Sequence, residues 1–368
     1  MTVGDIIRIC EQWAPRGAAW EKDNVGLQIG TTSKRVRKIL IALEVTERVV
    51  HEAIRKKSDL IITHHPLFFR LPRALTDSTN QGKIAREIIK HDISLYAMHT
   101  NIDRVRDGVN WTLARELGLQ EITFLKSLEK SMVKIVTFVP REMTERISQE
   151  MAVAGAGIIG KYTECSFRVK GVGTYRPDID AKPWAGTPGL LESAEEIRLE
   201  MVAPRWNVPA IIDALLRAHP YEEVAYDIYP VENGSPNYGI GAIGTFPTPM
   251  PASAFLNRVK KKISWEGFRY TTGKKRTIRR VAVCGGSGAE YLDAAILSGA
   301  DAFVTADISY HVFQDAEGKI FLIDAGHFET ERGIIIAMKS FLESSFHRTK
   351  RMIFVEITGV RTNPIFFS

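Results

Sequence analysis

Apolar stretches alternate with amphipathic stretches along the first third of the chain, and this pattern predicts alternating strands and helices. The expected elements, in chain order, are a helix over 3–13, a strand over 36–43, a helix over 46–55, a strand over 59–63, a helix over 81–91 and a strand over 93–98. Parallel strands need a crossover helix between them, so this order predicts a parallel α/β sheet. Residues 20–30 mix turn formers with apolar anchors, and we interpret Asp23, Asn24 and Gly26 as turn residues.

The last third of the chain repeats this plan. The expected elements are a strand over 279–284, a glycine-rich turn over 285–288, a helix over 289–298, strands over 301–305 and 320–323, and a helix over 330–342. The glycine-rich turn is either a tight strand-to-helix connection or an anion contact, since backbone N–H groups at such a turn can bind an anion. The chain therefore predicts two similar α/β halves of one domain, residues 1–127 and 248–368.

A different order of elements separates the two halves. Strand-like stretches over 132–139, 165–173, 195–202 and 223–229 alternate with helical stretches over 141–154 and 211–218. The order strand, helix, strand, strand, helix, strand is that of a ferredoxin-like α+β module. A block of this size can fold alone, so we expect an inserted domain over residues 128–247.

Composition narrows the class of protein. With 368 residues, of which 45% are hydrophobic and 25% charged, the chain is typical of soluble globular proteins and longer than a single core usually allows. No window has the roughly 18 uninterrupted apolar residues of a membrane helix, and the first residues lack the features of a signal peptide. The three cysteines are far apart and predict reduced thiols. We expect a cytoplasmic protein without a membrane partner.

The net charge of +6 is small for this length. Lysine and arginine gather in residues 258–262 and 274–280, but such runs usually form a solvated surface. A nucleic-acid partner is therefore not expected.

The chemistry of the chain centres on two adjacent histidines. His64 and His65 follow the apolar strand over 59–63, and Pro66 ends the pairing there because proline has no N–H to donate. Ligands of open α/β sheets bind beyond the carboxyl ends of the strands. Histidines at such an end are candidate metal ligands, although one could instead be a hydrogen-bonded core residue and the other merely exposed.

The two halves match at the positions that carry polar chemistry. Superposed by their strands, they pair Thr63 with Thr305, His65 with Asp307, His99 with His327 and Asp103 with Glu331. The patterns His-x-x-x-Asp and His-x-x-x-Glu place a nitrogen and an oxygen ligand one helical turn apart. Each pair alone could be an ordinary helix start. Together with His64 and His65 they predict one shared metal site.

These motifs resemble those of a known family. The segments IITHHPLFF, AMHTNID, VAVCGGSG, DAFVTADISYHVFQDA and DAGHFETE are similar to the Nif-three-like dinuclear metal-centre family, whose members are named GTP cyclohydrolase 1 type 2 homologues. The resemblance covers residues 1–125 and 248–368. The segments AGAGIIGKYTECSFRVKGVGTYRP and AHPYEEVAYDIYPV resemble the PII/CutA-like insert of the longer bacterial members.

The resemblance implies a ligand set for two divalent ions per chain. The implied ligands are His64, His65, Asp103, His327 and Glu331. Glu331 would bridge the ions. His99 stands where the family also has histidine, while Glu44 replaces an expected aspartate that we place outside the ligand set. The family further implies a homo-oligomer, commonly a hexameric ring.

Two functions follow as expectations. The first is metal-dependent hydrolysis of a small molecule or nucleotide, either by GTP cyclohydrolase-type ring opening or by phosphoester cleavage, through a water shared by the two ions. Zinc suits mixed histidine and carboxylate ligands, as do iron, manganese, nickel and cobalt. His99 or His311 would act as general base or would orient a ligand. The alternative is a non-catalytic metal-binding regulatory scaffold whose insert senses a ligand.

Overall fold

The computed structural model describes residues 1–263, 267–348 and 352–366. The chain divides into two compact units, one formed by Met1–Lys126 with Tyr238–Ser368 and the other by Ser127–Asn237. Strand β12, which begins at Ala242, belongs to the first unit. The expected insert boundary at residue 247 therefore falls inside this strand.

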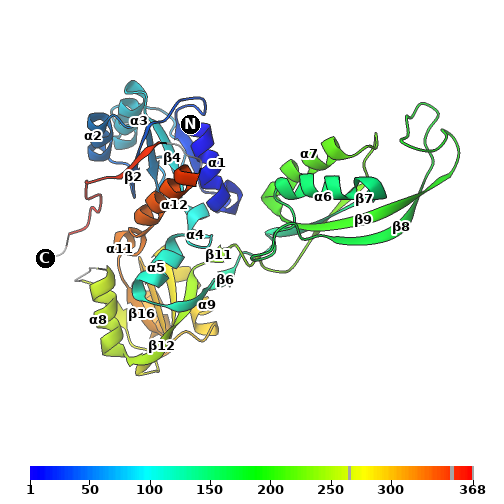
Figure 1. Ribbon diagram of the computed structural model, residues 1–368. Coiled ribbons are helices and arrows are strands. Elements are labelled where there is room, and N and C mark those ends of the chain that lie inside the picture. The colour runs from blue at the N-terminus through cyan, green and yellow to red at the C-terminus, as the bar shows by residue number, and fades with distance from the viewer. Residues whose placement is uncertain (264–266, 349–351, 367–368) are drawn as a thin grey trace. The chain divides into compact units, whose positions relative to one another are not determined.

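One sheet of the first unit has five strands in the order β1-β4-β3-β2-β17. Their bounds are Gly26–Ile29 (β1), Lys38–Ala42 (β2), Leu60–Thr63 (β3), Ser94–Ala97 (β4) and Phe354–Ile357 (β17). Strands β2, β3, β4 and β17 are parallel, and β1 is antiparallel to β4. The red β17 thus lies beside the blue β2 in Figure 1. The loop expected over residues 20–30 is wrong in its last part, because β1 pairs there with β4.

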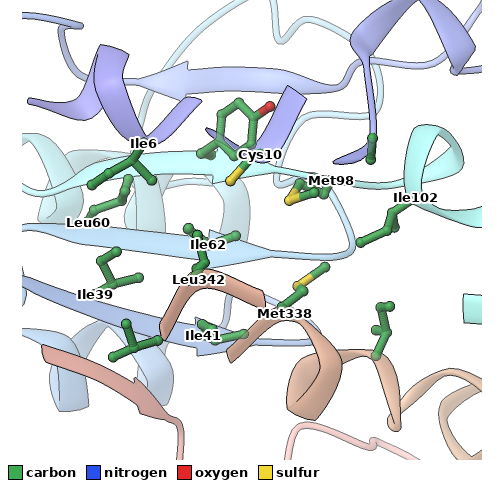
Figure 2. Close-up of a cluster of buried hydrophobic side chains, with 14 of the residues drawn as sticks. Ile6, Cys10, Ile39, Ile41, Leu60, Ile62, Met98, Ile102, Met338 and Leu342 are labelled. Atoms are coloured by element: carbon green, nitrogen blue, oxygen red, sulfur yellow. The ribbon is translucent and has the colours of Figure 1, made fainter. Parts of the chain in front are cut away.

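Helices cover both faces of this sheet. They are α1 (Val3–Trp13), α2 (Glu47–Lys56), α3 (Asn80–Lys90), the short α4 (Thr100–Asp103) and α12 (Ile334–Arg348). Side chains alternate along β2, so Ile39 and Ile41 pack with α1 and α12 while Leu40 packs with α2 and α3. Figure 2 shows the first of these layers, in which Cys10 of α1 and Met338 of α12 meet the strands.

The second sheet of this unit has six strands in the order β13-β16-β15-β14-β12-β5. Their bounds are Gln120–Thr123 (β5), Ala242–Pro251 (β12), Arg269–Thr271 (β13), Thr277–Ser287 (β14), Ala302–Ala306 (β15) and Phe321–Asp324 (β16). Strands β14, β15 and β16 are parallel, and the other three are antiparallel to their neighbours. Its helices are α5 (Val109–Leu117), α8 (Ala252–Ile263), α9 (Leu292–Leu297), α10 (Tyr310–Ala316) and α11 (His327–Glu331).

The single helix expected over residues 330–342 is wrong. Two helices, α11 and α12, take its place, and Arg332 and Gly333 separate them. A Cβ atom at Gly333 would lie 2.4 Å from Glu116 Oε1 and 2.8 Å from Thr112 Cγ2. A larger residue at this break would therefore force side chains of α5 to move.

The second unit has the predicted order of elements. They are β7 (Met132–Pro140), α6 (Thr144–Val153), β8 (Phe167–Tyr175), β9 (Glu192–Pro204), α7 (Val208–Ala218) and β10 (Tyr226–Pro230). The antiparallel sheet has the order β10-β7-β9-β8, which is the ferredoxin-like arrangement. The predicted fold class, two similar α/β halves interrupted by a ferredoxin-like α+β module, is confirmed.

The remaining elements are short. They are β6 (Lys126–Ser127), β11 (Gly239–Ile240) and the 3₁₀ helices Arg16–Ala18, Arg141–Met143, Arg205–Asn207 and Ala289–Tyr291. Within the described ranges no helix is long and apolar enough to cross a membrane.

Thiol reactivity tests the packing of both sheets. Cys10 and Cys284 are buried, whereas Cys165 is partly exposed. Burial raises the pKa of both buried thiols, to about 12 for Cys10, and the thiolate is the reactive form. We expect an aromatic disulfide reagent to label one thiol in the folded chain and all three after denaturation, measured by absorbance. Rapid labelling of two or three thiols in the folded protein would contradict this packing.

Candidate metal centre

The ends of β3 and β4 deliver three histidines to one edge of the first sheet. β3 ends at Thr63, so His64 and His65 follow directly, and His99 comes two residues after the end of β4. The backbone holds this edge in place, because His65 N donates to Leu43 O at 2.9 Å and Met98 N donates to Thr63 O at 2.8 Å. Suitable nitrogens of His64, His65 and His99 lie within 4.8 Å of one another.

The second half of the domain brings His327 and Glu331 to the same place. His327 begins α11 shortly after β16 ends, and Glu331 follows one turn later. Glu331 Oε2 lies 3.1 Å from His65 Nε2 and 3.2 Å from His327 Nε2. The two histidine Nε2 atoms are 3.4 Å apart. Three donor atoms from distant parts of the chain therefore form a small triangle.

The size of this triangle fits a metal ion. A tetrahedral zinc site with bonds of about 2.0–2.1 Å separates its ligand atoms by about 3.3 Å. The three separations of 3.1, 3.2 and 3.4 Å agree with that spacing. Two nitrogens and one carboxylate oxygen are also a common zinc donor set.

Glu331 links this triangle to a second set of donors. Its other oxygen, Oε1, lies 3.6 Å from His64 Nε2, and that nitrogen lies 3.8 Å from Asp103 Oδ1. One carboxylate thus stands between two groups of side chains.

Each imidazole in the cluster is oriented through its Nδ1 atom. His64 Nδ1 donates to Met98 O at 2.8 Å, since a carbonyl can only accept. His99 Nδ1 bonds the Asp23 carboxylate at 2.9 Å, and His327 Nδ1 bonds Asp307 Oδ2 at 2.7 Å. His65 Nδ1 lies 3.3 Å from Glu44 Oε1. Anchoring Nδ1 to a carbonyl or carboxylate directs Nε2 inward, as in metal-bound histidines.

Several buried atoms of the cluster have no hydrogen-bond partner among the described residues. They are His64 Nε2, Asp103 Oδ1 and Glu331 Oε2. Buried polar atoms are rarely left unsatisfied, because losing contact with water without a replacement costs about 1–3 kcal/mol or more. All three are atoms that can ligate a metal: His64 Nε2 and Asp103 Oδ1 lie near each other, and Glu331 Oε2 lies between His65 and His327, so the residues fit a bound cation.

The charges of the cluster also favour a bound cation. Burial lowers the pKa of His65 and His327, but the neighbouring carboxylates outweigh it and raise these values to about 10 and about 9. Burial raises the pKa of Glu331, yet the surrounding histidines prevail and hold it well below its usual range. The carboxylates therefore favour positive charge between these side chains.

A glycine shapes the wall beside Glu331. Gly286, at the end of β14, has φ +63°, and a Cβ there would lie 2.2 Å from Glu331 Oε1 and 3.2 Å from His327 Cε1. Its N–H donates to Thr330 Oγ1 at 3.0 Å. This glycine of β14 thus leaves room for the carboxylate. The turn expected over residues 285–288 is wrong in its first part, because β14 continues to Ser287.

An aromatic pair borders the cluster. Trp20 and Phe69 are 43% and 42% exposed, and their rings are stacked with centroids 6.4 Å apart. Phe69 also meets the His99 ring edge-on. Trp20 N donates to Thr100 Oγ1, which in turn donates to Asp23, so the pair is tied to the anchor of His99.

The structure brings six of the seven sequence-predicted site residues together. They are His64, His65, His99, Asp103, His327 and Glu331. His311 is exposed on α10, where it contacts Gln314 and Tyr310 of the same helix. The sequence did not predict that Asp23 and Asp307 anchor two of the imidazoles, although Asp307 matches His65 in the other half. In the sequence alone, turn chemistry is the better interpretation of Asp23 and Asn24.

Comparison with known proteins agrees with the sequence motifs. Residues 1–364 match the family model Duf34/NIF3 (NGG1p interacting factor 3). Two proteins named GTP cyclohydrolase 1 type 2 homolog, from Halalkalibacterium halodurans and Bacillus subtilis, are each 38% identical to this chain. Each match covers 98% of this chain, together with 98% of the Halalkalibacterium halodurans protein and 97% of the Bacillus subtilis protein. A Bacillus cereus protein related to NIF3 superposes with a TM-score of 0.85 at 38% identity, covering 100% of this chain and 99% of its own. The chain therefore belongs to the Duf34/NIF3 family.

Proposed function

We propose that the chain binds two divalent metal ions and is a metal-dependent hydrolase. The proposed ligands are His64, His65, Asp103, His327 and Glu331. The observation that carries the proposal is the convergence of imidazole Nε2 atoms, each oriented through Nδ1, on the two oxygens of the buried Glu331. Oε1 faces His64 and Oε2 faces His65 and His327, which supports a bridging role for this carboxylate.

Two bound ions would supply Lewis acidity and lower the pKa of a shared water. The chain's own residues provide the rest. Mixed nitrogen and oxygen donors suit zinc first, and also iron, manganese, nickel or cobalt. Asp103 and Glu331 offset the positive charge, while Asp23, Asp307 and Glu44 hold the imidazoles in place.

His99 is the proposed proton acceptor. Its Nδ1 is bound to Asp23, so Nε2 is the atom that would take a proton from the attacking water, and the carboxylate would stabilise the resulting imidazolium. His311 does not receive this role, because its contacts are with its own helix.

The substrate is proposed to carry a planar ring. The curated relatives are named GTP cyclohydrolase 1 type 2 homologs, and the exposed Trp20 and Phe69 rings beside His99 offer a stacking surface. Both GTP ring opening and phosphoester hydrolysis of a nucleotide suit such a site. The test is turnover of GTP and of an aryl phosphodiester by untagged protein, before and after chelation and metal return. Bound metal without any turnover would favour the alternative, a regulatory metal-binding scaffold.

Removal of the second unit distinguishes the proposed hydrolase from the alternative, a regulatory scaffold whose second unit senses a ligand. Gly239 approaches Lys126 closely, since a Cβ there would lie 2.6 Å from Lys126 O, so a short glycine linker can replace residues 127–237. We expect the shortened chain to keep its metal content and turnover within about twofold, because all the proposed ligands lie in the first unit. Metal analysis and the same assays measure this. A folded but metal-free or inactive product would show that the second unit takes part in the site.

A further inference from the structure

A cavity of about 540 Å³ lies in the second unit, which contains none of the proposed metal ligands. Its walls come from residues 173–185, which are the end of β8 and the loop after it, and from residues 221–225 after α7. Phe138 of β7 and Glu196 of β9 complete it. Its volume lies within the range of small-molecule sites, about 300–1,000 Å³.

Aromatic rings form much of the wall, and two of them are fixed in place. The hydroxyl of Tyr175 donates to Ala185 O at 2.7 Å, and the hydroxyl of Tyr221 donates to Glu196 Oε1 at 2.9 Å. Trp184, 57% exposed, also lines the cavity. Because the hydroxyls are engaged by the protein, the ring orientations are set before any ligand arrives.

The charge of the lining is strongly negative. Four carboxylates line the cavity, those of Asp178, Glu196, Glu222 and Glu223. Among its described lining residues the one cationic side chain is Arg176, whose Nη1 donates to Gly189 O at 3.0 Å. An anionic ligand would meet like charges here, whereas a cation would be attracted.

Both carboxylate oxygens of Glu196 have close neighbours in the cavity wall. One of its oxygens accepts the Tyr221 hydroxyl. The other lies over Gly173, where a Cβ would approach Oε2 to 2.3 Å, so a larger residue there would force the carboxylate to move.

We propose that this cavity binds an organic cation, an ammonium or guanidinium group joined to an aromatic or apolar body. The cationic group would pair with Glu196 through a charge-assisted hydrogen bond. It would also face the aromatic rings, which attract cations through their negative faces. The apolar body would cover Phe138 and Trp184. This site is independent of the proposed metal centre.

Isothermal titration calorimetry of the full chain with two probes tests the proposal. Tryptamine and indole-3-acetate share one ring system and carry opposite charges. We expect tryptamine to bind at least about tenfold more tightly, since its ammonium group gains both cation–π attraction and a carboxylate partner, whereas the acetate is repelled by the lining. No binding of tryptamine, or equal binding of both probes, would overturn the proposal.

Two variants locate the binding. Glu196→Gln keeps the shape and the acceptor for Tyr221 but removes the charge, so tryptamine affinity should fall about fivefold or more. Glu195→Gln is the matched control, because neighbouring strand residues point to opposite faces and Glu195 lies outside the cavity lining. Its affinity should equal that of the unmodified chain. Equal affinities of both variants would place any binding elsewhere and contradict the assignment.

Discussion

A Glu331→Gln variant is expected to lose at least one of two bound metal ions. Glu331 is buried, and its two oxygens lie 3.1–3.6 Å from the Nε2 atoms of His64, His65 and His327. Glutamine preserves the volume but removes the charge and turns an amide toward the histidines. Elemental mass spectrometry measures the ions per chain. Thermal unfolding gives a second readout, because a bound ion stabilises the folded state in proportion to RT ln(1 + [L]/Kd).

Glu329→Gln is the matched control. Glu329 is a buried carboxylate on the same helix, and it accepts a hydrogen bond from Asn363 Nδ2 at 2.7 Å. This variant should keep its ions and should still lose thermal stability on chelation, as the unmodified chain does. Two ions in Glu331→Gln would remove the carboxylate from the ligand set.

A Gly286→Ala variant is expected to disrupt the centre although it substitutes none of the proposed ligands. The added Cβ would lie 2.2 Å from Glu331 Oε1, so the carboxylate or the β14 turn has to move. Displacement of Glu331 also removes its contacts with the histidines. We expect loss of at least one ion by the same metal analysis, together with reduced turnover.

Gly318→Ala is the control that distinguishes the clash at Gly286 from the strain of a left-handed backbone conformation. Gly318 has φ +66°, nearly that of Gly286 at +63°, but a Cβ there meets no atom within 4 Å. Both variants carry the left-handed strain of about 1–2 kcal/mol, and only Gly286→Ala carries the clash. Normal metal content in Gly318→Ala but not in Gly286→Ala is the expected result. Equal metal content in the two would mean that Glu331 is not held as described.

The fold was readable from local patterns. Apolar runs that end in polar residues identified the strands at whose carboxyl ends His64, His99 and His327 stand. The internal match of the two halves, together with the family motifs, led to the six residues that the structure brings together. Such signals depend on neighbours in sequence, which is why a single chain carries them.

The long-range contacts of the site could not be predicted from local sequence patterns. The bond from His99 to Asp23 spans 76 residues, and the sequence around Asp23 favours its interpretation as a turn residue. Asp307 was noticed as the counterpart of His65, but its bond to His327 depends on how β15 and β16 pair. The break at Gly333 depends on contact with Glu116 and Thr112 of α5, which helical periodicity does not report.

The measurement that tests the central claim most directly is the metal content of untagged protein by elemental mass spectrometry, unmodified beside His65→Ala. His65 Nε2 lies 3.1 Å from Glu331 and 3.4 Å from His327 Nε2, so its loss opens the triangle of donors. His311→Ala, on the exposed face of α10, is the control. The account predicts two ions in the unmodified chain and in His311→Ala, and fewer in His65→Ala. No bound metal in the unmodified chain, or an unchanged count in His65→Ala, would contradict it.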